Sequence, residues 1–221
     1  MSPTLRGRLL WLGLFSLAFG YIEAAVVVYL REPYYPGGFQ FPVVPMPGHL
    51  LRTEIIREAA TLLLLLSVAR LSARRGLHQL GVFAYCFGLW DLVYYLALKV
   101  LVDWPASLLD WDILFLIPLP WAGPVVAPIA VSLALVAGAV FLLRLPEDGP
   151  SPFRRIDWLV EGAAGLAIIA SFLWNLPALA AEEIPSTYPW WLFGMGLGGG
   201  AGWFAWRLTR HWQQPASAGR L

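Results

Sequence analysis

Residues 80–102 read LGVFAYCFGLWDLVYYLALKVLV, an apolar run that is interrupted by two charged residues, Asp91 and Lys99. A helix of about 20 apolar residues is long enough to cross the roughly 30 Å hydrocarbon core of a bilayer. An ionisable side chain inside such a helix is costly, and it indicates a functional site by default. This stretch therefore predicts a membrane fold and marks one place in it where chemistry occurs.

Five further apolar runs flank this segment, and 59% of the 221 residues are hydrophobic whereas 13% are charged. This composition is typical of membrane proteins and leaves little sequence for a soluble domain. We therefore predict an all-α polytopic bundle of six transmembrane helices that forms a single domain, residues 1–221. The predicted spans are approximately residues 9–30, 49–71, 80–102, 124–143, 156–180 and 190–207.

The arginines lie mainly where alternate loops of such a bundle would meet. Arg6 and Arg8 precede the first span, and other arginines occupy residues 70–75, residues 144–155 and the segment from residue 207 onward. The positive-inside rule then places both termini in the cytoplasm. Lysine occurs once, and this preference for arginine favours a bacterial protein of the inner membrane. The net charge of +1 argues against nucleic acid as a partner.

The segment before the fourth span is broken by prolines, among them Pro118 and Pro120. Proline disrupts the helical hydrogen-bond ladder. Residues 103–123 also contain three tryptophans, which favour the membrane interface. We expect this segment to lie at the outer interface as a lid or re-entrant wall, together with the aromatic and proline-rich residues 34–47.

Three carboxylates of the first three spans fall at a similar depth. At 1.5 Å per residue, Glu23, Glu58 and Asp91 lie about 10–17 Å from the outer ends of their helices. The positive charge of Arg57 offsets one of these three negative charges. The negative surplus predicts that a carboxyl carries a proton near neutral pH or that a cation binds there. Protonated carboxyls are suited to general acid catalysis.

We interpret Glu23, Glu58 and Asp91 as catalytic candidates, with Glu23 or Asp91 as the acid and Glu58, held by Arg57, as the base. The predicted substrate-binding residues are Arg57, Trp90, Tyr94, Tyr95, Lys99 and Trp121. Aromatic faces near an acid stabilise a developing cation. The sequence therefore favours an enzyme of the cyclase, isomerase or hydratase type that acts on a lipid-like or isoprenoid substrate.

Two other functions fit the same residues: a proton- or cation-coupled transporter, and a non-catalytic subunit or assembly factor of a larger membrane complex. A structural role, in which Arg57 pairs with a carboxylate to lock the helices, is a further alternative. No cofactor or metal is predicted, because the sequence has one cysteine, Cys86, and no paired-histidine motif. A divalent cation between the carboxylates stays open.

The last span contains closely spaced glycines. Gly194, Gly198 and Gly202 recur at every fourth position, and Gly196 and Gly200 form a second row. Small residues at this spacing let helix backbones approach closely. The pattern predicts helix–helix packing, either within the chain or between copies through the first row.

Overall fold

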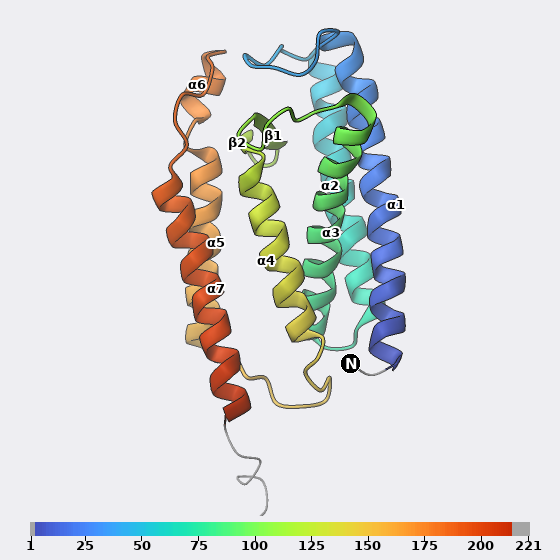
Figure 1. Cartoon of the computed structure of the whole chain (residues 1–221), viewed down its shortest axis with the longest axis vertical. Coiled ribbons are helices and arrows are strands. Elements are labelled where there is room, and N and C mark those ends of the chain that lie inside the picture. The colour runs from blue at the N-terminus through green and yellow to red at the C-terminus, as the bar shows by residue number, and fades with distance from the viewer. Residues whose placement is uncertain (1–2, 214–221) are drawn as a thin grey trace, which may run out of the picture. The chain divides into compact units, whose positions relative to one another are not determined.

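The computed structural model describes residues 3–213, which form seven helices and one two-stranded hairpin (Figure 1). Helices occupy all six stretches that were predicted as spans. The predominance of helix is therefore confirmed. The elements are α1 (Pro3–Tyr34), α2 (Gly48–Ser72), α3 (Gly76–Val102), β1 (Trp111–Phe115), β2 (Trp121–Pro124), α4 (Val126–Leu142), α5 (Arg155–Leu173), α6 (Leu176–Ala180) and α7 (Trp190–Gln213).

Three of the described helical segments are long and apolar enough to cross a membrane: Leu5–Tyr34, Gly76–Val102 and Arg155–Ala180. Many large apolar side chains on the helices point outward, such as Trp11 and Leu71. An outward apolar surface of this kind suits a lipid environment. These features indicate a membrane protein, whereas six crossings stay a prediction.

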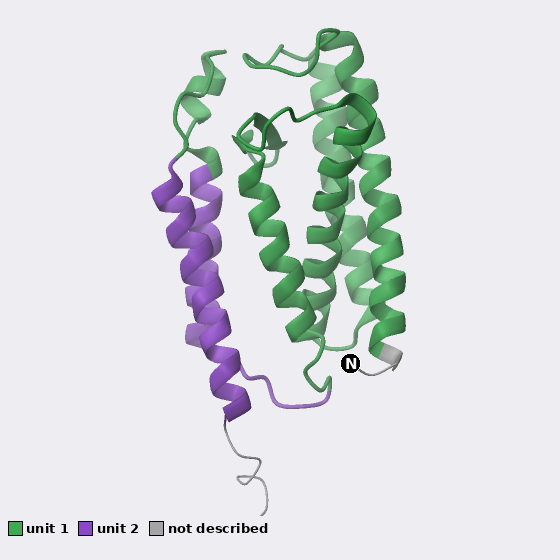
Figure 2. Cartoon of the chain, in the orientation of Figure 1, with its two compact units in different colours: residues 1–147, 172–188 green, residues 148–171, 189–221 purple. Residues whose placement is uncertain are grey.

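The chain forms two compact units (Figure 2). The first comprises Met1–Glu147 and Phe172–Tyr188, and the second comprises Asp148–Ser171 and Pro189–Leu221. The candidate site described below lies entirely in the first unit.

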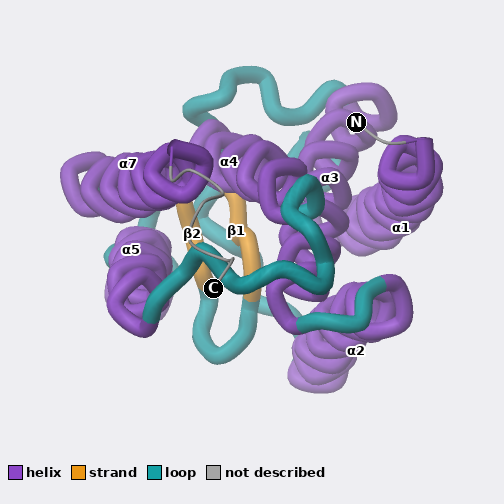
Figure 3. The backbone as a smooth tube through the Cα atoms, turned by 90° about the horizontal axis from the view of Figure 1, so that it is seen from below, coloured by secondary structure: helices purple, strands orange, loops and turns teal. Residues whose placement is uncertain are grey.

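Helix α3 is the centre of the first unit and packs against α1, α2 and α4 (Figure 3). Two glycines let its neighbours approach closely. A Cβ on Gly20 of α1 would lie 2.6 Å from the carbonyl oxygen of Trp90, and one on Gly88 would lie 2.6 Å from that of Ser132 in α4. Because real Cβ atoms do not approach backbone so closely, glycine at these two positions sets the spacing around α3.

The proline-broken segment contains a short antiparallel hairpin, which the sequence did not predict. Strands β1 and β2 pair with Asp112 opposite Gly123. The pairing of β1 with β2 satisfies part of the hairpin's backbone hydrogen bonding. Its first strand reaches the helices of the first unit and contributes to the site.

In the second unit, α5 and α7 pack through the second row of glycines. A Cβ on Gly196 would lie 2.8 Å from the carbonyl oxygen of Ala164, and one on Gly200 would lie 3.0 Å from the Ala164 Cβ. The first row, Gly194, Gly198 and Gly202, meets no described atom of another segment within 4 Å. Packing within the chain therefore uses the second row. Association between copies through the first row stays a prediction.

Candidate functional site

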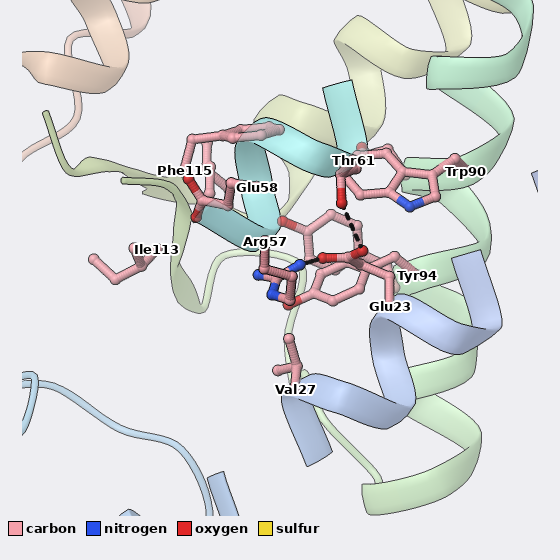
Figure 4. A pocket seen from close by; sticks show the side chains of 12 residues that line it. Glu23, Val27, Arg57, Glu58, Thr61, Trp90, Tyr94, Ile113 and Phe115 are labelled. Atoms are coloured by element: carbon pink, nitrogen blue, oxygen red, sulfur yellow. Dashed lines mark hydrogen bonds and ion pairs between the residues drawn. The ribbon is translucent and has the colours of Figure 1, made fainter. Parts of the chain in front are cut away.

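A small pocket of about 60 Å³ lies where α1, α2, α3 and β1 converge (Figure 4). The predicted catalytic candidates Glu23, Glu58 and Asp91 all line it. Four of the six predicted substrate-binding residues do so as well. The full lining is Glu23, Val27, Arg57, Glu58, Thr61, Trp90, Asp91, Tyr94, Tyr95, Ile113, Leu114 and Phe115.

Arg57 is the ion-pairing centre of this pocket. It pairs with Glu23 of α1, and its Nε donates to Glu54 one turn earlier on α2 at 2.8 Å. Glu23 also accepts a hydrogen bond from the Thr61 hydroxyl at 3.2 Å, and Figure 4 shows both Glu23 contacts. Arg57 was expected to hold Glu58, but its ion pairs are with Glu23 and Glu54. The pocket's described cation is thus already shared by two carboxylates.

Glu58 forms a hydrogen bond with the hairpin, and the Arg57 charge acts on it without a direct ion pair. Its Oε2 accepts the backbone N–H of Leu116, the residue after β1, at 2.8 Å. This contact joins α2 to a segment 58 residues away in sequence. Glu58 is therefore both a wall of the pocket and an anchor of the hairpin.

Asp91 lies on the α4 side of α3 and is 9% exposed. Its Oδ2 accepts a hydrogen bond from the Ser132 hydroxyl at 2.7 Å. No described cation forms an ion pair with Asp91. A carboxyl in such surroundings is stabilised in its neutral form unless a positive charge binds nearby.

A second buried ion pair lies beside the small pocket. Asp112 on β1 is 1% exposed; it pairs with Arg31 of α1 at 2.8 Å and accepts a hydrogen bond from the Tyr95 hydroxyl at 3.3 Å. Burial raises the pKa of Asp112, and the Arg31 charge opposes this shift. The Arg31 guanidinium also lies 4.1 Å from the ring centroid of Phe39 and 4.2 Å from that of Trp104.

This Arg31–Asp112 pair was not identified from the sequence. The two residues are 81 positions apart, and their contact depends on the hairpin. The sequence offered one signal, an arginine at the outer end of the first apolar run where the positive-inside rule does not require one.

A large pocket of about 240 Å³ adjoins the small one and shares Val27, Arg57, Glu58, Tyr94 and Ile113 with it. Most of its wall is apolar, and half of its lining residues come from α1 and the proline-rich loop that follows α1. The other lining residues are Leu30, Arg31, Tyr34, Tyr35, Phe39, Val43, Val44, Pro45, Met46, Leu51, Glu54, Asp112, Leu116, Pro120 and Leu179. The two pockets together form an amphipathic site with a polar end.

Two predicted substrate-binding residues lie outside both pockets. Lys99 donates to the carbonyl oxygen of Pro105 at 3.0 Å and pairs with Asp103 at 2.6 Å. Trp121 packs its ring near those of Phe115 and Phe172, at centroid distances of 5.9 and 6.2 Å. Lys99 thus closes the end of α3, and Trp121 supports the hairpin.

Among the described residues, no group of three or more histidine, cysteine or acidic side chains has an arrangement that could hold a metal ion. Arg57 lies between Glu23 and Glu54, and its charge offsets those of both carboxylates.

Comparison with known proteins adds no further assignment. No protein-family model matches the chain, and no curated protein or solved structure matches it significantly.

Proposed function

We propose that this protein is a membrane-embedded enzyme that acts on a lipid-like, isoprenoid-type substrate by acid–base chemistry. The observation that carries the proposal is Asp91, a buried carboxyl that faces a cavity and has a hydroxyl as its partner rather than a cation. A carboxylic acid that keeps its proton in an apolar setting can protonate an alkene, epoxide or alcohol. Asp91 is the general acid in this proposal.

The other groups divide the remaining tasks. Trp90 and Tyr94 line the small pocket beside Asp91, and their ring faces favour positive charge that develops on the substrate. Glu58 shares this pocket and accepts the Leu116 backbone N–H; a carboxylate has about four acceptor sites, so it keeps capacity to take up a proton as the base. Glu23, neutralised by Arg57, positions the polar end of the substrate.

The two pockets fit the two parts of such a substrate. The small pocket, about 60 Å³, has room for a reacting group of a few heavy atoms. The large pocket, about 240 Å³ and mainly apolar, accommodates the hydrocarbon body. A substrate that reaches this site from the lipid needs no aqueous entrance.

The membrane arrangement completes the proposal. We propose six transmembrane spans in a bacterial inner membrane, with both termini in the cytoplasm and the site in the outer half of the bilayer. The three long apolar helices and the distribution of arginines support this arrangement.

The proposal is tested by incubating the purified protein with a bacterial total lipid extract in deuterium oxide. We expect one lipid species to be consumed and a product to appear that carries a deuteron delivered by Asp91. The Asp91→Asn variant, which keeps the shape and can still bind Ser132, should lose at least about 100-fold in rate, the usual contribution of a general acid. Asp103→Asn, an exposed acid outside both pockets, is the matched control.

No lipid conversion by the unmodified protein would contradict the enzyme proposal. Uptake of a solute into proteoliposomes that depends on a pH gradient and on Asp91 would favour the transporter instead. One observation favours this second function: Glu54, Arg57, Glu23 and Thr61 form a continuous chain of polar contacts.

A further inference from the structure

The small pocket contains a hydrogen-bond donor that has no acceptor. The Trp90 indole Nε1–H is buried, and no described residue accepts a hydrogen bond from it. Trp90 is 5% exposed and lines the pocket. In Figure 4 its nitrogen lies on the edge of the ring that faces the Glu23 carboxyl group. A buried donor without a partner is costly, and this one borders a cavity in which a ligand can supply the acceptor.

The charges around the two pockets restrict that acceptor. Arg31 and Arg57 are the described cations of the lining, and both already form ion pairs with carboxylates. An anionic group would add to a surplus of negative charge in a poorly solvated place. The acceptor is therefore an uncharged atom. The five carboxylates of the combined lining are Glu23, Glu54, Glu58, Asp91 and Asp112.

We propose that the small pocket binds the neutral oxygen of a long-chain alcohol or carbonyl compound, and that Trp90 donates a hydrogen bond to this oxygen. This inference rests on the proposed lipid-binding function and names the head group. A hydroxyl fits best, because it accepts from the Trp90 N–H and donates to Glu23, as the Thr61 hydroxyl already does. Phosphate, pyrophosphate and carboxylate head groups would add to the negative surplus, so they are expected to bind more weakly.

The chain itself provides a matched pair of tryptophans. Trp121 also has a buried Nε1–H without a described acceptor, but it lines neither pocket. Replacing either residue by phenylalanine removes one N–H and keeps an aromatic ring. An effect on ligand binding that is confined to Trp90 therefore reports the hydrogen bond to the ligand rather than a general change in packing.

The test measures displacement of tritiated 1-decanol from the purified protein in maltoside micelles. The competitors are unlabelled decanol, its isostere undecane, decyl phosphate and decyltrimethylammonium. We expect decanol to compete at least about tenfold better than decyl phosphate or undecane. Trp90→Phe should weaken decanol binding about fivefold, the loss expected for one neutral hydrogen bond, without changing the affinity for undecane. Trp121→Phe should change neither.

Three results would overturn the inference. The first is that decanol does not bind specifically. The second is that decyl phosphate or decyltrimethylammonium binds as well as decanol, and the third is that the two tryptophan variants have equal effects. If Trp90→Phe does not fold, the competitor series on the unmodified protein still tests whether the pocket prefers a neutral head group. Selective alcohol binding without any lipid turnover would contradict the enzyme proposal alone. Turnover of an anionic lipid would contradict the head-group inference alone.

Discussion

Arg57 and its two carboxylate partners connect α1 with α2 in the middle of the polar site. Glu23 comes from α1, and Glu54 lies on α2 like Arg57 itself. All three side chains are largely buried. In such a place the loss of one charge costs more than the loss of both, because the remaining charge stays desolvated without a partner.

We therefore expect Arg57→Gln to lower the free energy of unfolding by about 3 kcal/mol, near the lower limit for breaking a buried pair. The double variant Glu23→Gln, Arg57→Gln should lose clearly less than the sum of the two single variants. Thermal unfolding in detergent micelles measures both. Additive losses would show that the Glu23–Arg57 pair contributes no coupling.

At the residue scale, depth arithmetic grouped Glu23, Glu58 and Asp91, which all line the small pocket. One helical rise per residue is enough to show that Glu23, Glu58 and Asp91 reach a common level. The arithmetic gives no direction around the helix axis and no partner in loops. It therefore missed Ser132 and Asp112, and it included Lys99, whose side chain turns to the end of its own helix.

The hairpin is the element that completes the site, and Glu58 anchors it. Glu58→Ala removes the acceptor for the Leu116 N–H and leaves that group without its partner. We expect faster amide hydrogen exchange across residues 111–124, by about tenfold, as the loss of a hydrogen bond to a charged group implies. Glu58→Gln keeps an acceptor oxygen and should exchange almost as slowly as the unmodified protein. Equal exchange in both variants would contradict the anchor.

The close contact of α3 with α4 depends on Gly88. A methyl group there would lie 2.6 Å from the Ser132 carbonyl oxygen and 2.8 Å from the Val136 side chain. We expect Gly88→Ala to destabilise the protein by about 1–3 kcal/mol, the usual cost of overpacking. Gly198→Ala on α7, where no described atom is near, is the control and should be neutral or slightly stabilising. Thermal unfolding of the two variants side by side provides the measurement.

The loop between α2 and α3 is held by Glu147, which follows α4. The Glu147 carboxylate accepts the Arg74 backbone N–H at 2.7 Å, and this bond holds the pKa of Glu147 below its usual 4.5. Because the folded pKa is the lower one, the stabilisation is complete above about pH 4.5 and is lost as the pH falls through the folded value. Glu147→Gln should flatten this part of the pH profile. The shift at an exposed site is small, about 1 °C in Tm between pH 7 and pH 3.

Helices were easier to predict than the hairpin for a physical reason. Apolar runs of about 20 residues specify helices without knowledge of any other segment. A hairpin over residues 111–124 depends on cross-strand pairing and on anchors such as Glu58 and Arg31, which lie far away in sequence. The prolines predicted where the helical structure is interrupted, but they did not predict that the interrupted segment forms a hairpin.

At the scale of the whole molecule, the predicted topology is open to a direct test. In a Cys86→Ala background, we introduce a cysteine at Gly37, in the exposed loop after α1, or at Pro150, in the loop after α4. A membrane-impermeant maleimide added to spheroplasts should label Gly37→Cys and leave Pro150→Cys unlabelled until the cells are lysed. The opposite pattern would reverse the orientation, and labelling of both in intact spheroplasts would contradict the spans between them.

The glycines of α7 illustrate what sequence alone leaves undecided. Two rows with the same spacing were equally suited to packing, and the structure uses the row of Gly196 and Gly200 against α5. The spacing of small residues thus predicted a close helix contact but not its partner. The partner depends on which helix the loops bring alongside.

The two contacts of Glu58 couple ligand binding in the pocket to movement of the hairpin. The same carboxylate faces the ligand space and binds the Leu116 N–H. A ligand donor or proton that binds Oε2 of Glu58 competes with the Leu116 N–H for this oxygen. By thermodynamic reciprocity, tightening the hairpin must then weaken that ligand by the same factor by which the ligand loosens the hairpin. Ligand binding in the cavity and release of the hairpin are thus thermodynamically coupled.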